Sequence, residues 1–172
     1  VVIGLKNDDV VVSAAITSGD QDLFLASANG YAIRFNEVDV RDMGLAAGGI
    51  KGMELGKDDF VIRMIAVQNE KSTLMALTTK GIGKRSDLNE YSRIRRGGKG
   101  IINFKLSDKT GAVCTILEIQ KNEPVLLATV KGKTKKVKAK SIKLMGRATQ
   151  GNASIKVAQK DELLQAIYLP EI

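Results

Sequence analysis

The stretch "SRIRRGGKGIINFKL" at residues 92–106 holds the densest group of side chains that could do chemistry. Its cations surround a set of glycines: Arg93, Arg95, Arg96 and Lys99 stand around Gly97, Gly98 and Gly100. Glycine lets a backbone come close to another group, and clustered cations attract an anion. The anion could be a bound nucleotide, a membrane surface or a nucleic-acid backbone.

Composition narrows the possible functions. The 172 residues include no histidine and a single cysteine, Cys114, which removes His-based acid/base catalysis, most zinc sites and any internal disulfide. Aromatic residues make up only 4%, so base stacking on an aromatic platform is disfavoured. Because no apolar stretch reaches the roughly 20 residues of a membrane span, we expect a cytoplasmic protein without a membrane partner.

The net charge of +8 is concentrated in two segments. Residues 80–110 hold 9 Lys/Arg against 3 Asp/Glu, and residues 131–156 hold 9 against none. Residues 1–79 are acidic, with 7 against 11. Self-similarity explains why there are two basic segments, since the sequence repeats with a period of 51 residues.

The repeat is marked by glycines. Gly30, Gly81 and Gly132 close equivalent turns 51 residues apart, within "LFLASANGYAIRF", "TLMALTTKGIGKR" and "PVLLATVKGKTKKV". Nineteen residues beyond each turn comes a second glycine, in "MGLAAGG", "IRRGGKG" and "MGRATQG". The predicted units are residues 20–70, 71–121 and 122–172, and residues 1–19 match the end of a preceding unit.

The pattern of each unit predicts four short strands. A buried apolar strand is followed by a tight turn, then by two alternating strands and a closing apolar strand. Four-stranded units of about 50 residues are typical of β-propellers. We therefore expect an all-β, propeller-like array of successive antiparallel blades. Three such units and a remnant are too few for ordinary closure, so we expect a partial array.

Motifs for nucleotide binding and catalysis are incomplete. A phosphate-binding loop around the Gly-Lys of "GGKG" fails, because Arg93 stands where its first glycine belongs and Gly100 where Ser/Thr belongs. The pairs Asp8/Asp9 and Asp58/Asp59 occupy equivalent places before an apolar strand, which indicates turn residues rather than a carboxylate dyad. We expect no enzyme activity, cofactor, metal site or small-molecule substrate in this chain.

The basic positions recur in register. Arg34, Arg85 and Lys136 lie four residues after the turn glycines, and Lys84 and Lys135 lie three residues after theirs. In a radial array, equivalent positions fall on one continuous rim, and a positive stripe without readers of base edges is typical of phosphate-backbone binding. The alternative is that lysine-rich strands are merely solvated faces that guard a sheet edge.

"LMALTTKGIGKRSDLNEYSRIRRGGKGIINFKLSDKTGAV" and "IKLMGRATQGNASIKV" resemble blades of the C-terminal domain of the DNA gyrase A protein. The resemblance spans the three repeats, and it extends to the related topoisomerase IV protein. It implies a β-pinwheel in which neighbouring blades exchange strands and duplex DNA wraps around the outer rim. It also implies partners, namely the rest of the gyrase A protein and the gyrase B protein, in an ATP-dependent topoisomerase whose catalytic groups lie elsewhere.

The resemblance implies that a set of lysines and arginines contacts DNA. These candidate phosphate contacts are Lys84, Arg85, Arg93, Arg95, Arg96, Lys99, Lys133, Lys135, Lys136 and Arg147. The segment "IRRGGKG" resembles the family's gyrase box, but Ile94 replaces its first glutamine, so the segment does not separate gyrase from topoisomerase IV. Two explanations of its glycines stay open: close approach to DNA phosphates, or a tight turn between blades. Two functional alternatives stay open: a propeller that serves as a protein-interaction scaffold, and a partial array too incomplete to bind DNA usefully.

Overall fold

The structure is a computed structural model that describes residues 2–6 and 8–169. In those residues the regular elements are eleven β-strands and three short 3-10 turns, with no α-helix. The 3-10 turns, η1 (Glu37–Asp39), η2 (Leu88–Glu90) and η3 (Ala139–Ser141), recur at the repeat period of 51 residues. The all-β prediction is confirmed.

Three strands of each repeat form one antiparallel group. In the first repeat, β1 (Asp22–Ser27) lies between β2 (Tyr31–Asn36) and β3 (Val61–Ala66). In the second repeat, β4 (Thr73–Thr78) lies between β5 (Ile82–Asp87) and β7 (Val113–Ile119). In the third repeat, β8 (Pro124–Thr129) lies between β9 (Thr134–Lys138) and β11 (Leu163–Tyr168). The predicted hairpins around the turn glycines are therefore present in all three repeats.

The remaining strand of a repeat belongs to its neighbour's sheet. β6 (Ile101–Ile102) comes from the second repeat but pairs with β2, and β10 (Asn152–Ala153) comes from the third repeat but pairs with β5. Each four-stranded sheet therefore combines three strands of one repeat with the short strand of the next repeat. The strand exchange implied by the resemblance is present: in the second and third repeats, the short strand begins just after the second glycine and crosses to the preceding repeat.

The third sheet has three strands, in the order β11-β8-β9. No strand of the described residues pairs with the outer edge of β9. The stretch of the first repeat that corresponds to β6 and β10 starts at Ile50, and it forms no strand with the rest of the described chain. Residues 2–6 and 8–19 also contain no strand, although Gly4 N–H donates to Ala47 O at 3.0 Å.

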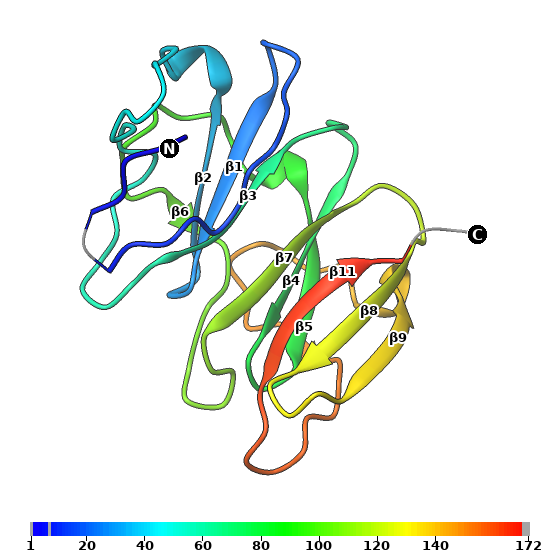
Figure 1. Cartoon of the computed structure of the whole chain (residues 1–172). Helices are drawn as coiled ribbons and strands as arrows, with labels where there is room; N and C mark the ends of the chain where they lie inside the picture. Colours follow the sequence, from blue (N-terminus) through cyan, green and yellow to red (C-terminus); the bar gives the residue numbers. More distant parts are fainter. Residues whose placement is uncertain (1, 7, 170–172) are drawn as a thin grey trace.

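The core lies between successive sheets. Phe24 of β1 packs edge-on against Tyr91 of the second repeat, with ring centroids 5.0 Å apart. A second cluster joins the middle and last sheets, with Met75, Leu117 and Leu127 each almost fully buried. On one side of the molecule β7 contacts both β3 and β11, so these three edge strands lie on the inner side of the array, and β6, β10 and β9 form the opposite edges (Figure 1).

Candidate nucleic-acid interface

The basic loop at residues 93–100 leads from η2 into β6, and its backbone is attached to the first repeat. Ile94 N–H donates to Arg34 O at 2.8 Å, and Gly97 N–H donates to Gly52 O at 2.6 Å. Glu54 N–H donates in return to Gly98 O at 2.8 Å. A loop of the second repeat is therefore held in place by the backbone of the first.

Packing between repeats requires Gly100 of this loop, and a positive φ favours glycine at Gly97. A Cβ on Gly100 would stand 2.2 Å from Ala32 O, and both Gly100 and Gly97 have positive φ, at 76° and 85°. Gly98 differs, since a Cβ there would meet no atom closer than Arg95 O, at 3.9 Å. Of the two explanations left open by the sequence, the tight turn between blades accounts for Gly97 through its positive φ and for Gly100 through its close contact with Ala32 O.

Arg93 is engaged in an ion-pair cluster with the first repeat. Its Nε lies 2.7 Å from Asp22 Oδ2, and its guanidinium also reaches Glu70 at 3.3 Å. Arg34, which is 6% exposed, contacts the same two carboxylates. The hydrogen bond with Asp22 is the main reason why the pKa of Arg93 is raised. Arg93 and Arg34 are therefore neutralised within the protein.

Arg96 and Arg147 are equivalent residues with equivalent contacts. Arg96 Nε donates to Asp39 O at 2.8 Å and Arg147 Nε donates to Glu90 O at 3.1 Å. Their second donors bind the carbonyls of Lys51 and Ile102, which are also 51 residues apart. Both arginines thus connect a loop to the backbone of the preceding repeat, a role that the sequence period did not reveal.

Lys84 has no solvent exposure, which corrects its assignment as a phosphate contact. Its ammonium donates to Ser86 Oγ at 3.0 Å, to Gly146 O at 3.1 Å and to Arg147 O, and it lies 5.4 Å from the centre of the Phe104 ring. Burial lowers the pKa of Lys84 to about 8. Alternation along a strand predicts one solvated face, but here the following repeat covers that face.

Arg85 is partly buried and also serves the contact between repeats. Its Nε donates to Ile142 O at 2.9 Å, and its guanidinium approaches Thr73 Oγ1 at 3.3 Å. The backbone around it pairs with the third repeat as well, since Arg85 N–H donates to Lys143 O at 2.8 Å. A guanidinium held in this way has fewer donors left for a phosphate.

The remaining candidates project from outer edges of the array. Arg95 and Lys99 are exposed in the loop before β6, and Lys99 lies 4.9 Å from the centre of the Tyr31 ring. Lys133, Lys135 and Lys136 are exposed on β9 and the turn before it. The side chains of Arg95 and of these three lysines make no hydrogen bond or ion pair with residues 2–6 and 8–169.

The basic segment around β9 is larger than the candidate set. Residues 131–143 carry seven lysines and no acid, and all seven side chains are exposed. The members not singled out from the sequence are Lys131, Lys138, Lys140 and Lys143. Their signal was the uninterrupted charge run itself, which spans β9 and continues through η3. No lysine of this segment forms an ion pair with a carboxylate of the described chain, and Asp161, which accepts from Lys131 N–H at 3.1 Å, is an acid placed beside it.

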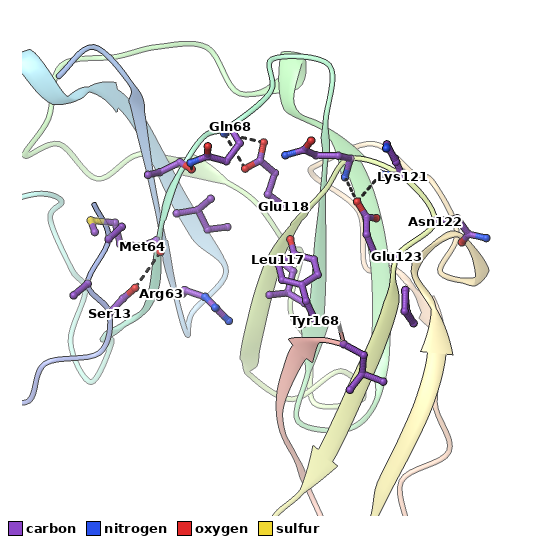
Figure 2. A pocket seen from close by; sticks show the side chains of 17 residues that line it. Ser13, Arg63, Met64, Gln68, Leu117, Glu118, Lys121, Asn122, Glu123 and Tyr168 are labelled. Carbon is purple, nitrogen blue, oxygen red and sulfur yellow. Dashed lines mark hydrogen bonds between the residues drawn. The ribbon is translucent and has the colours of Figure 1, made fainter. Parts of the chain in front are cut away.

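A cavity of about 790 Å³ lies on the inner side, between β3, β7 and β11 (Figure 2). Several of its polar side chains bind the backbone: Glu118 accepts from Gln68 N–H and Asn69 N–H, and Ser13 donates to Met64 O. Glu123 accepts from Gln120 N–H and Lys121 N–H. These contacts connect sheets and turns, and they do not converge on a common reacting position.

The described residues also bear on metal binding, on the role of the paired aspartates and on membrane-spanning helices. Residues 2–6 and 8–169 contain no group of three or more acidic or cysteine side chains placed to hold a metal ion. Asp59 and Asp161 cap turns by accepting from the N–H of Asn29 and Lys131, so the predicted turn role of Asp59 is confirmed. In the same part of the chain, no helix has the length and apolar character needed to cross a membrane.

Comparison with known proteins gives one consistent family. The family model described as DNA gyrase C-terminal domain, beta-propeller, matches residues 21–68, 72–116 and 123–169, one segment for each repeat. The DNA gyrase A protein of Ureaplasma parvum is 36% identical over 163 residues, which cover 95% of this chain and 19% of that protein. The gyrase A protein of Pseudomonas aeruginosa is 35% identical over 164 residues, again 95% of this chain and 18% of the relative. The chain thus spans about a fifth of these relatives.

Solved structures agree with this assignment. The structure of a DNA gyrase A C-terminal domain superposes with a TM-score of 0.91 at 27% identity, covering 98% of this chain and 57% of the other. The crystal structure of a topoisomerase IV C-terminal domain gives the same TM-score at 26% identity, covering 98% and 52%. The fold prediction is confirmed, and the similarity extends to both kinds of topoisomerase domain.

Proposed function

Because this chain belongs to the family of DNA gyrase C-terminal domains, we propose that it binds duplex DNA and supports DNA wrapping by a gyrase. The observation that carries the proposal is the exposed lysine segment at residues 131–143, which contains no acid. Clustered, uncompensated cations neutralise phosphates and release condensed counterions from duplex DNA. The binding is therefore electrostatic in origin.

The edge arrangement supports a path along the outside of the array. The loop with Arg95 and Lys99 leads into β6, and Lys135 and Lys136 lie on β9. β6 and β9 are outer edges of the first and last sheets, opposite the inner strands. A duplex that follows these edges would meet free cations at both ends of the three-sheet array. Arg85, Arg93, Arg96 and Arg147 shape this surface, and Lys84 lies beneath it.

We propose further that binding is largely independent of base sequence and that the chain is not catalytic by itself. Basic side chains on edge strands and loops position phosphates but do not read base edges. The partners are double-stranded DNA, the rest of the gyrase A protein and the gyrase B protein, in the cytoplasm. The chain is organised as repeat units at residues 20–70, 71–121 and 122–172, and residues 1–19 are the end of a preceding unit. Each of the first two units completes its sheet with a strand from the unit that follows it.

Two other functions make different predictions. A topoisomerase IV domain would use the same phosphate contacts. The fold supports this alternative as well as it supports a gyrase domain, because both kinds of C-terminal domain superpose with a TM-score of 0.91. A propeller used as a protein-interaction scaffold would not need the acid-free lysine segment. Salt-sensitive binding to duplex DNA separates the scaffold from both topoisomerase alternatives.

The proposal is tested by titrating linear duplex DNA at several salt concentrations. A surface that neutralises roughly 4 to 8 phosphates gives a slope of log affinity against log salt of about −4 to −7. Replacing Lys133, Lys135 and Lys136 together with alanine should reduce the steepness by up to about 3. A matched control, Lys57→Ala, Lys71→Ala and Lys121→Ala, removes three exposed lysines from turns outside the two basic segments and should change the slope little.

Neither triple variant should lose folding stability, because exposed cations on a strand or turn stabilise a fold very little. A K133A/K135A/K136A variant that keeps its melting temperature and its full salt slope would show that β9 is a solvated edge. Equal effects of the two triple variants would show that net charge matters and the location of the lysines does not. Either result contradicts the proposed DNA path.

A further inference from the structure

Two carboxylates lie directly beneath the basic loop at residues 93–100. Asp22 has a side chain with no exposure, and its Oδ2 lies 2.5 Å from Arg34 Nε and 2.7 Å from Arg93 Nε. Glu70 contacts the same two guanidinium groups from the turn between β3 and β4, and its side chain is 55% exposed. The cluster of two acids and two arginines is formally neutral. It joins β1 and β2 of the first repeat to a loop of the second.

The cluster is placed to fix the conformation of this loop. Arg93 is its first residue, and the next residue, Ile94, donates its N–H to Arg34 O at 2.8 Å. Arg34 also reaches the carbonyls of Leu88, the first residue of η2, and of Tyr91, directly after η2, both at 3.4 Å. The exposed Arg95 therefore follows a segment whose side chain and backbone are both tied to the ion-pair cluster.

The equivalent contact between the second and third repeats is built differently. The residues 51 positions after Asp22, Glu70 and Arg93 are Thr73, Lys121 and Leu144, so the ion-pair cluster has no counterpart there. In that contact, the buried Lys84 holds the carbonyls of Gly146 and Arg147 instead. The fold can therefore join two repeats without the cluster. The cluster occurs beside the loop that carries the exposed cations Arg95 and Lys99. The loop of the third repeat has no cation at these two positions, where Gly146 and Gln150 stand.

We infer that Asp22 and Glu70 are positioning residues that hold the loop at 93–100 for contact with duplex phosphates, so that two acids strengthen DNA binding. The inference rests on the proposed function for its consequence in binding. Simple electrostatics predicts the opposite sign, because removing a negative charge near the interface should strengthen attraction to DNA. The two explanations therefore differ in the direction of the effect.

The decisive variant is Glu70→Gln, which removes a charge from a half-exposed side chain while keeping its shape. We expect weaker binding of linear duplex DNA, by roughly 8-fold at 0.1 M salt for each phosphate contact that the loop loses, and a salt slope less steep by about 1 to 2. The matched control is Asp108→Asn, which removes an exposed acid outside the cluster and should leave affinity equal or slightly higher. Unchanged or tighter binding by the Glu70→Gln variant overturns the inference.

Two further measurements separate positioning from other causes. Adding Arg95→Ala and Lys99→Ala to Glu70→Gln should cost little more affinity, whereas independent effects would add. Trypsin should cut after Arg95 faster in the Glu70→Gln and Asp22→Asn variants than in the Asp108→Asn control, because the loop is no longer held. The trypsin assay needs no DNA. If the unaltered chain fails to bind DNA, the proposed function is wrong, whereas unchanged trypsin cleavage shows that the positioning inference is wrong.

Discussion

Raising the pH from 7 to 9 should stabilise this fold, because Lys84 loses its proton more easily inside the protein than in the unfolded chain. Burial lowers the pKa of Lys84 from its ordinary 10.5 to about 8. Between those two values the unfolded state binds more protons than the folded state, so the free energy of unfolding rises with pH. Most lysines that gain a partner act in the opposite direction.

The size of the effect follows from the proton balance. A lysine with a folded pKa of about 8 contributes about 1.3 kcal/mol to the free energy of unfolding between pH 7 and pH 9. This value is a ceiling, since the carbonyls of Gly146 and Arg147 accept hydrogen bonds from the charged ammonium and favour it.

Cys114 opposes Lys84 over part of this range. Burial raises the pKa of the Cys114 thiol from its ordinary 9.0 to about 12, so the unfolded chain releases the thiol proton first. This lowers the free energy of unfolding by about 0.4 kcal/mol by pH 9. Burial also raises the pKa of Tyr91, an effect that destabilises the fold only as the pH approaches the ordinary value of 10 and beyond. The net expected gain is about 1 kcal/mol.

The assay is urea unfolding at pH 7, 8 and 9 for the unaltered chain and two variants. Cys114→Ala should show a larger gain, because the opposing group is gone. Lys84→Met, which keeps the length of the buried stem, should show no gain and a small loss. A Lys84→Met variant with the same rise as the unaltered chain would refute the reasoning, as would a Cys114→Ala variant that loses stability from pH 7 to pH 9.

Three other outcomes are expected. Gly100→Ala should lower the free energy of unfolding by about 2–4 kcal/mol in the urea assay, because its Cβ would stand 2.2 Å from Ala32 O at positive φ. The control Gly98→Ala has free space around its Cβ and should change the free energy of unfolding little. Arg147→Ala should cost about 1–2 kcal/mol by removing charged donors from two carbonyls, whereas Arg95→Ala should leave the melting temperature unchanged and weaken DNA binding. A duplex and its scrambled sequence of matched bendability should bind alike in competition, and a preference above about 100-fold would contradict phosphate-backbone binding.

The 51-residue period made the hairpins of the fold predictable from the sequence. The turn glycines indicated the hairpins, because a tight turn with positive φ needs glycine, and Gly30, Gly81 and Gly132 have φ of 80°, 77° and 78°. Strand exchange did not follow from the period. A strand of two residues, such as β6, has too little pattern to indicate its partner, and pairing with the preceding repeat depends on where the chain between η2 and β6 runs.

The candidate site was harder to predict, because register identifies equivalent positions but not their exposure. Lys84 and Lys135 are equivalent, yet Lys84 is buried and Lys135 is exposed. Residues 146 and 147 of the following repeat cover Lys84, while no described residue covers the outer edge of β9. A weak signal existed at Lys84, since Ser86 stands two residues along the same strand, on the same face, and supplies an acceptor for a buried ammonium.

The cations of this chain therefore divide into two functional groups, and the salt dependence of DNA binding can count one of them. Guanidinium and ammonium groups that hold neighbouring repeats, such as Arg34, Lys84 and Arg96, are already satisfied by carbonyls or carboxylates and release no DNA counterions. If all ten sequence candidates contacted phosphates, the slope would approach about −9, whereas the five that remain free would give about −4.5. A slope near −9 would therefore mean either that the additional lysines of residues 131–143 all contact DNA or that the contacts between repeats open on binding. Trypsin cleavage at Arg96 decides between these two cases. The K133A/K135A/K136A variant loses about a third of its slope in both, but only an array that opens on binding also loses its resistance to trypsin at Arg96.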